Sequence, residues 1–194
     1  MTAAGSALIG HVAFLRGVNV GGRNRVAMDG LRQIATDLGL VGVRTYLQSG
    51  NLAFLASEEG GAAAEPALGR ALAERLGIEI PVVVRTRAAL AAAIAANPFA
   101  EAASGDPSHL LVSFLNGAPR MDRLPAIQAA ARLGERAQLV GRELFIHYAG
   151  GVAGSRLTSA LIDRQLGVIG TARNWTTVVA LEALARGLAD DAAV

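Results

Sequence analysis

The order of apolar strand-like segments and amphipathic helical segments constrains the fold most, because it occurs twice along the chain. The first half contains four strand-like and two helical segments: strands at 12–15, 43–48, 52–55 and 78–84, and helices at 31–38 and 62–77. The second half contains a similar set: strands at 110–115, 138–140, 144–148 and 168–171, and helices at 121–133 and 155–166. The order β-α-β-β-α-β in each half is that of a ferredoxin-like unit.

We therefore predict an α+β protein of two ferredoxin-like halves, each with an antiparallel sheet covered on one face by helices. A segment of small residues and proline at 101–108 separates the two sets of elements. The N-terminal half is placed at 1–103 and the C-terminal half at 104–194. An additional helix, capped by Asn174, is expected at the end of the C-terminal half.

Composition excludes several classes of protein. The 194 residues include no cysteine, which excludes a thiolate nucleophile and a zinc ribbon and fits a reducing compartment. Although 52% of the residues are hydrophobic, charged residues interrupt every apolar stretch before the roughly 18 residues that a membrane span needs. No basic residue precedes the short apolar run near the N-terminus, so no secretory signal is expected. We expect a cytoplasmic protein with no membrane partner.

The basic residues are distributed unevenly along the chain. All 18 are arginine, against 16 acidic residues, so the formal net charge at pH 7 is only +2. The isoelectric point of about 9.9 reflects the absence of lysine and cysteine, not a large positive surplus. Residues 1–50 and 151–180 together hold eight arginines and only three acidic residues. The positive surplus thus lies in two segments that also contain glycine-rich and polar motifs.

A glycine-rich loop at 17–25 connects the first strand to the first helix. In such a loop backbone N–H groups can point at a phosphate, with arginine and asparagine side chains as further donors. The candidate ligand-binding residues here are Arg16, Asn19, Gly21, Gly22, Arg23 and Asn24. The loop lacks the lysine-containing ending of a nucleotide P-loop and the spacing of a dinucleotide site. The alternative is a tight crossover whose arginines are solvated.

The segment Gln48-Ser49-Gly50-Asn51 is the predicted turn between the second and third strands. Ser49 and Asn51 are further candidate ligand-binding residues, and the alternative is a plain turn. In a ferredoxin-like unit we expect this turn and the loop after the first strand at opposite ends of the sheet.

Two arginines stand at expected helix starts in the C-terminal half. Ser155-Arg156 and Arg173-Asn174 each combine a capping residue with an arginine, where free N–H groups and the helix dipole favour an anion. Ordinary caps are the alternative. Because the surplus charge lies in the same segments, we expect the 17–25 loop and both helix starts to face one shared anion-binding cleft.

Other site chemistries find little support in the residue pattern. The three histidines, His11, His109 and His147, have no partners at metal-ligand spacing, so no metal site is predicted. No Ser-His-Asp arrangement or close carboxylate pair stands out, and Glu58-Glu59 is interpreted as a solvated loop. Only two of the eight aromatic residues fall on the strands that an RNA-recognition module would use.

Several motifs, in order along the chain, resemble one bacterial family. They are Phe14-Leu15-Arg16-Gly17-Val18-Asn19-Val20-Gly21-Gly22-Arg23-Asn24-Arg25-Val26, Thr45-Tyr46-Leu47-Gln48-Ser49-Gly50-Asn51, Asn97-Pro98-Phe99, Ser155-Arg156-Leu157 and Thr171-Ala172-Arg173-Asn174-Trp175. By these motifs the chain resembles the family called domain of unknown function sixteen-ninety-seven. The resemblance implies two ferredoxin-like halves and no known substrate, cofactor or catalytic residue.

One departure from that family bears on chemistry. Relatives commonly carry lysine at the positions of Arg23, Arg25 and Arg156. Arginine keeps the positive charge but cannot act as a Schiff-base amine, so covalent lysine chemistry is not expected.

Three classes of function are compatible with these observations. The leading hypothesis is a binder of a phosphate-bearing ligand, either a nucleotide or a nucleic-acid backbone, held by the arginine-, glycine- and asparagine-rich segments. The second is an enzyme acting on a small anionic substrate, with Tyr46, Ser49 or Ser155 in the chemistry. The third is a non-catalytic interaction module that assembles as a homodimer.

Overall fold

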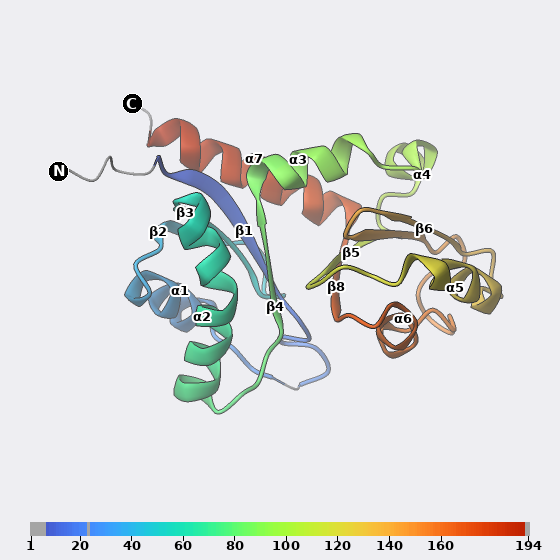
Figure 1. Cartoon of the computed structure of the whole chain (residues 1–194), viewed down its shortest axis with the longest axis horizontal. Helices are drawn as coiled ribbons and strands as arrows, with labels where there is room; N and C mark the ends of the chain where they lie inside the picture. Colours follow the sequence, from blue (N-terminus) through green and yellow to red (C-terminus); the bar gives the residue numbers. More distant parts are fainter. Residues whose placement is uncertain (1–6, 23, 193–194) are drawn as a thin grey trace. The chain divides into compact units, whose positions relative to one another are not determined.

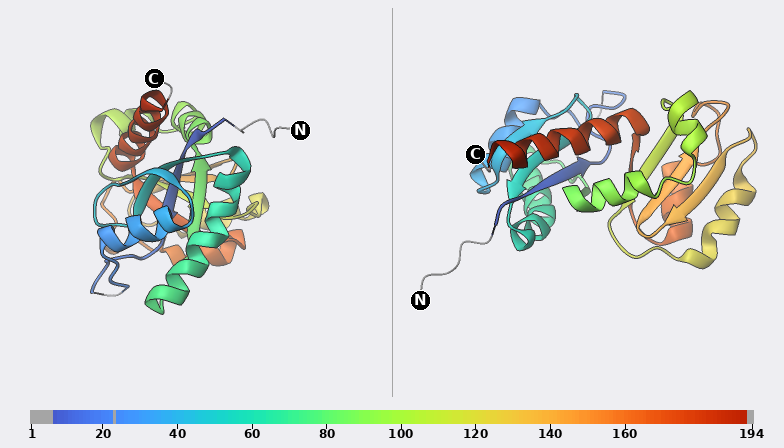
Figure 2. Two further views of the ribbon diagram at one scale, coloured as in Figure 1. Left: turned by 90° about the vertical axis from the view of Figure 1, so that its left-hand side faces the viewer. Right: turned by 90° about the horizontal axis from the view of Figure 1, so that it is seen from above.

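The chain divides into two compact units in the computed structural model, which describes residues 7–22 and 24–192 (Figure 1, Figure 2). The N-terminal unit contains the chain up to Ala91 and the segment from Leu181 onward. The C-terminal unit is Ala92–Ala180. Along the described part of the chain, no helix combines the length and the apolar character needed to cross a membrane.

The N-terminal unit has the order β-α-β-β-α-β: β1 Ile9–Leu15, α1 Met28–Asp37, β2 Val41–Thr45, β3 Asn51–Ala56, α2 Glu58–Leu76 and β4 Val82–Thr86. Its strands form one antiparallel sheet in the order β2-β3-β1-β4, and α1 and α2 cover one face of it (Figure 1). Because side chains alternate across a strand, Ala13, Leu15 and Phe54 share that face. They form a buried core with Leu31 of α1 and Leu68 of α2.

The C-terminal unit repeats this architecture: β5 Leu110–Leu115, a 3-10 turn η1 Met121–Arg123, α5 Leu124–Ala130, β6 Arg136–Val140, β7 Glu143–His147, α6 Ser159–Leu166 and β8 Gly170–Asn174. The sheet order is β6-β7-β5-β8, all antiparallel. Its core joins Leu115 and Ile146 of the sheet to Ile127 of α5 and Ile162 of α6. The predicted α+β fold of two ferredoxin-like halves is confirmed.

Three further helices complete the chain, and the last of them belongs partly to the N-terminal unit, contrary to the expected boundary. They are α3 Arg87–Ala95, α4 Ala100–Gly105 and α7 Trp175–Asp191. The last part of α7 packs on the N-terminal unit, because Gly10 of β1 has no side chain: a Cβ there would lie 2.6 Å from the Ala185 carbonyl oxygen. An ion pair of 3.1 Å between Arg87 Nη1 and Glu182 Oε1 adds to this contact.

The expected division at 103/104 therefore differs from the observed units at two places. Residues 92–103 belong to the C-terminal unit, and the end of the last helix belongs to the N-terminal unit. The segment at 101–108, interpreted as a separator, instead contains most of α4.

The acidic pair at 58–59 lies in a helix, not in a solvated loop. The Ser57 hydroxyl accepts a hydrogen bond of 3.0 Å from Gly60 N and caps α2, so Glu58 and Glu59 fall in its first turn. Negative side chains are favoured there by the helix dipole. The predicted helix at 62–77 thus begins about one turn earlier than its apolar pattern indicated.

Candidate functional site

The loop after β1 and the β2–β3 turn lie at the same end of the N-terminal sheet. β1 pairs antiparallel with β3, with Phe14 opposite Asn51, so the end of β1 lies beside the start of β3. Leu15 N donates to Gly50 O at 2.8 Å across this junction. The expectation that the two segments occupy opposite ends of the sheet was wrong, because antiparallel pairing reverses the direction of the second strand.

Asn19 joins the loop to the turn. Its Nδ2 donates to Gln48 O at 2.7 Å and to Val26 O at 2.9 Å, while its Oδ1 accepts from Val26 N at 2.9 Å. Its φ of 56° lies in the left-handed region, which asparagine tolerates better than most residues. The amide of Asn19 therefore positions the backbone of the loop.

The other predicted polar residues of this region have similar local partners. Asn24 Nδ2 donates to Gly17 O at 3.2 Å. Asn51 is fully buried, and its Nδ2 donates to Tyr46 O and to Ser49 Oγ, both at 2.9 Å. These side chains hold the loop and the turn in shape, as Asn19 does.

Replacing Asn19 by alanine is expected to lower the free energy of unfolding by about 1.5 kcal/mol, because three hydrogen bonds are lost in a partly solvated loop. Urea unfolding of the full chain measures this. Asn24→Ala, which loses one exposed hydrogen bond, is the matched control and should change stability by less than about 0.5 kcal/mol. Equal losses in the two variants would contradict the linking role of Asn19.

A pocket of about 490 Å³ lies where the loop, the turn and the start of α1 meet. We call it the loop pocket; its lining residues are Asn19, Gly22, Arg25, Val26, Ala27 and Gln48. Ala27 is the N-cap of α1 and offers no side-chain hydrogen bond to the first turn. The first turn of α1 therefore has no side-chain cap from Ala27, which itself lines the pocket, and uncapped N–H groups at a helix start favour an anion.

The arginines of the loop differ in their surroundings. Arg25 lines the loop pocket, is exposed, and makes no ion pair with any residue in 7–22 or 24–192. Arg23 lies outside the described residues. Arg16 is half-buried, and its backbone N donates to Pro81 O at 2.9 Å. Arg25 was not among the candidates from the sequence, although its place three residues before α1 was a usable signal.

Ser155 does not start a helix. Thr158 caps α6 instead, its Oγ1 accepting from Leu161 N at 3.3 Å. Ser155 Oγ donates to Glu135 Oε1 at 2.5 Å and accepts from Leu157 N at 3.1 Å. The predicted cap was wrong because this serine belongs to the segment before α6, where the Glu135 carboxylate fixes its hydroxyl.

Glu135 was missed by the sequence reasoning. Its side chain is nearly buried, and its Oε2 accepts from Leu133 N at 2.6 Å and Arg132 N at 2.9 Å. The hydrogen bond from Ser155, with these backbone bonds, lowers the pKa of Glu135 to about 2. The sequence around Glu135 does not indicate this role, because its partner Ser155 lies 20 residues away.

The remaining predicted residues lie in the C-terminal unit. Asn174 Oδ1 accepts from Thr177 N at 2.9 Å, which confirms it as the cap of α7. Arg173 Nη1 donates to Thr171 Oγ1 at 3.0 Å and Ala172 O at 2.8 Å, and burial lowers its pKa to about 10. Arg156 is exposed.

The two predicted arginine motifs of the C-terminal unit do not converge. Asn174 ends β8, at one edge of the sheet, where it pairs with Leu111 of β5. Ser155 contacts Glu135, which lies directly before β6 at the other edge. β7 and β5 lie between them. A cleft that includes both helix starts is therefore not formed, because they lie at opposite edges of one sheet. Convergence of the 17–25 loop with one of them stays a prediction.

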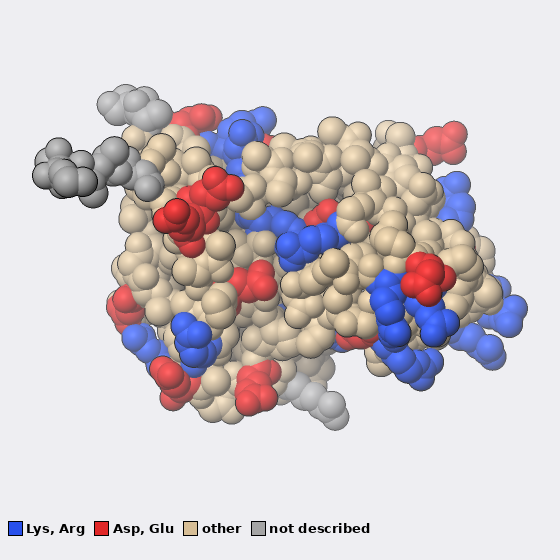
Figure 3. Space-filling model, in the orientation of Figure 1, with Lys and Arg blue, Asp and Glu red and all other residues tan. Residues whose placement is uncertain are grey.

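Exposed arginines also gather on the C-terminal unit, over α5 and α6 (Figure 3). Arg120 directly precedes η1 and Arg123 is its last residue, just before α5. Arg120 Nη2 donates to Arg164 O of α6 at 3.0 Å. Asp122 Oδ2 lies 3.8 Å from Arg123 Nε and offsets part of the positive charge. Arg120 and Arg123 lie outside the two segments in which the sequence placed its positive surplus.

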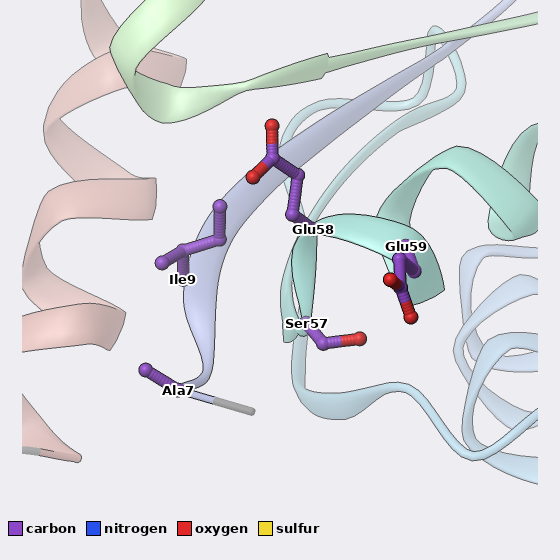
Figure 4. Close-up of a pocket in the computed structure, with 5 residues that line it drawn as sticks. All are labelled: Ala7, Ile9, Ser57, Glu58 and Glu59. Carbon is purple, nitrogen blue, oxygen red and sulfur yellow. The ribbon is translucent and has the colours of Figure 1, made fainter. Parts of the chain in front are cut away.

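A second pocket of the N-terminal unit, about 520 Å³, has the opposite character (Figure 4). Ala7 and Ile9 line it from the start of β1, and Ser57, Glu58 and Glu59 line it from the start of α2. Two carboxylates in the lining oppose an anion. This pocket therefore does not suit the ligand that the loop pocket suits.

Two histidines of the C-terminal unit share one carboxylate. Asp106 accepts from His109 Nδ1 at 2.8 Å and from His147 Nε2 at 3.0 Å, and the bond from His147 contributes most to the lowered pKa of Asp106. Within the described residues, no group of three or more histidines and acidic residues is arranged to hold a metal ion.

Two ferredoxin-like units in one chain, each with the sheet order 2-3-1-4, define the class of this protein. A solved structure with a similar fold is that of the conserved bacterial protein SP0830 from Streptococcus pneumoniae. Its TM-score is 0.72 at 23% sequence identity, over 92% of this chain and 99% of that chain. The chain belongs to the family described as protein of unknown function (DUF1697), whose model matches residues 9–145. No curated protein matches it.

Proposed function

We propose that the N-terminal unit binds a phosphate-bearing ligand, a nucleotide or a nucleic-acid backbone, in the loop pocket. The main support for this proposal is that the loop pocket is lined both by Ala27, the N-cap of a helix without a side-chain cap, and by the exposed Arg25. Each feature attracts an anion, and together they offer several convergent donors.

The backbone of the loop adds to this arrangement. Gly21 and Gly22 have φ values of 58° and 76°, and a Cβ at either would meet no atom within 4 Å. Glycine is therefore required there by the backbone conformation and not by crowding. The open space above these residues leaves a ligand free to approach the main chain.

An acidic side chain near the start of α1 weakens the site only partly. Asp29 lies in the first turn of α1, where its charge would oppose a phosphate. It is paired with Arg32, and Arg32 Nη1 also donates to Thr45 Oγ1 at 2.6 Å. The pair offsets the negative charge of Asp29, and Arg25, which makes no ion pair within the described residues, supplies positive charge to the pocket.

A thermal-shift series with sodium pyrophosphate, ATP and a short single-stranded RNA, each at two salt concentrations, tests the proposal. A ligand present at a hundred times its Kd stabilises the folded state by about 2.7 kcal/mol. We expect Arg25→Ala to weaken pyrophosphate binding at least about tenfold, because a charge-assisted hydrogen bond is lost. The matched control is Arg70→Ala, which removes an exposed arginine of α2 outside the pocket and should leave binding unchanged.

The outcomes separate the possible ligands. A shift with RNA that disappears at high salt indicates backbone binding, whereas a salt-tolerant shift with ATP indicates a nucleotide. If Arg25→Ala binds pyrophosphate as tightly as the wild type, the loop pocket is not the site. The exposed arginines at Arg120, Arg123 and Arg164 would then be the next candidates.

A further inference from the structure

The C-terminal unit contains a pocket of about 260 Å³ between α6 and the helix-covered face of its sheet. We call it the α6 pocket. Its polar lining residues are Ser113, Tyr148, Thr158, Ser159 and Asp163, and Gly170 and Ala172 of β8 close one side. All of these residues belong to the C-terminal unit. The pocket is independent of the loop pocket.

Ser113 is the unusual member of this lining. It lies in the middle of β5 between Leu111 and Leu115, and only 6% of its surface is exposed. It is also one of the polar residues that line the α6 pocket. A core strand position normally carries an apolar residue, so a hydroxyl here gives the pocket a polar group at an otherwise apolar sheet face.

The neighbouring strand leaves space at this hydroxyl. Gly170 of β8 lies beside Ser113, and a Cβ there would be 2.4 Å from Ser113 Oγ. Gly170 N donates to Asp163 Oδ1 at 3.1 Å, which holds the carboxylate of α6 over the same region. Ser113, Gly170 and Asp163 thus form the polar side of the α6 pocket.

Two further groups define what the pocket can recognise. The Tyr148 hydroxyl donates to Leu157 O at 2.9 Å, and burial raises its pKa to about 12, so it stays protonated and its oxygen can accept. Asp163 supplies negative charge, which opposes an anionic ligand. The opposite walls are apolar, formed by Leu111, Ile146, Leu157 and Ile162.

We propose that the α6 pocket binds a small uncharged molecule that carries an amide or hydroxyl group on a compact apolar body. Such a group can accept a hydrogen bond from Ser113 and donate one toward Asp163 or Tyr148. The apolar body would fill the space along Leu111 and Ile162, and the volume limits the ligand to fewer atoms than a typical drug-sized molecule.

Isovaleramide and its charged isostere isovalerate are suitable probes, because they share one apolar body. The full-length, uniformly 15N-labelled protein is titrated with each while backbone amide signals are followed. We expect saturable shifts at Ser113, Asp163 and Gly170 with isovaleramide, and at least about tenfold weaker binding of isovalerate, because of the Asp163 charge. No saturable shift with isovaleramide, or equal affinity for the two probes, would overturn the proposal.

Ser113→Ala supplies a second, independent readout. Removing this small hydroxyl should leave the Tm of the free protein nearly unchanged, while isovaleramide binding weakens about tenfold through loss of one hydrogen bond. The matched control is Ser104→Ala on the exposed part of α4, which should change neither quantity. A lowered Tm with unchanged isovaleramide binding would show that Ser113 serves the fold alone, and the proposal would fail.

Discussion

Replacing Gly61 by alanine is expected to lower the free energy of unfolding by about 3 kcal/mol, although alanine favours helices. Gly61 lies buried in α2, and a Cβ there would be 1.9 Å from His11 Nε2. The imidazole cannot easily move, because it stacks on Phe54 at 5.4 Å and its Nδ1 lies 3.0 Å from Ile9 O. Overpacking costs about 1–3 kcal/mol or more and exceeds the propensity gain of at most about 1 kcal/mol.

The double variant His11→Ala/Gly61→Ala tests that explanation. Removing the ring makes space for the new methyl group, so the double variant should be more stable than the sum of the two single changes predicts, by about 1–3 kcal/mol. Urea unfolding of all four proteins measures this coupling. A coupling energy near zero would show that the loss in Gly61→Ala has another cause.

Glu135→Gln is expected to cost about 3 kcal/mol of stability, because charged acceptors hold the Ser155 hydroxyl and the N–H groups of Arg132 and Leu133. A glutamine side chain has only one carbonyl oxygen to accept these hydrogen bonds. Its NH2 group would lie against one of the remaining donors, and that hydrogen bond would be lost. Ser155→Ala leaves the carboxylate and both backbone bonds in place and should cost clearly less.

The same carboxylate predicts a pH dependence. Its pKa is lowered from 4.5 to about 2 in the folded chain, so the unfolded chain binds more protons between these values. The stabilisation is complete above about pH 4.5 and is lost as the pH falls toward 2. Urea unfolding at several pH values should show a smaller loss of stability in this range for Glu135→Gln than for the wild type. Parallel pH profiles would contradict the lowered pKa.

The order of strands and helices could be predicted because apolar periodicity is a local property of the sequence. The two β-α-β-β-α-β sets were found in this way, and the capping role of Asn174 needed only its neighbours. The ends of the helices were harder to predict. The cap at Ser57 starts α2 before its apolar pattern begins, and Thr158, not Ser155, starts α6.

The candidate site depended more on contacts between distant residues. Asn19 binds Gln48 O, 29 residues away, and Ser155 binds Glu135, 20 residues away. The contact of Gly10 with Ala185, which assigns the end of α7 to the N-terminal unit, joins opposite ends of the chain. Such pairings follow from how strands and helices are placed in space, which residue type alone does not reveal.

The most direct test of phosphate binding in the loop pocket is a titration of the 15N-labelled protein with sodium pyrophosphate, followed residue by residue. We expect saturable amide shifts at Gly22 and at Met28, Asp29 and Gly30 in the first turn of α1, with loss of saturation in Arg25→Ala and its retention in Arg70→Ala. Shifts confined to residues outside the loop pocket, or no saturable shift anywhere, would contradict it.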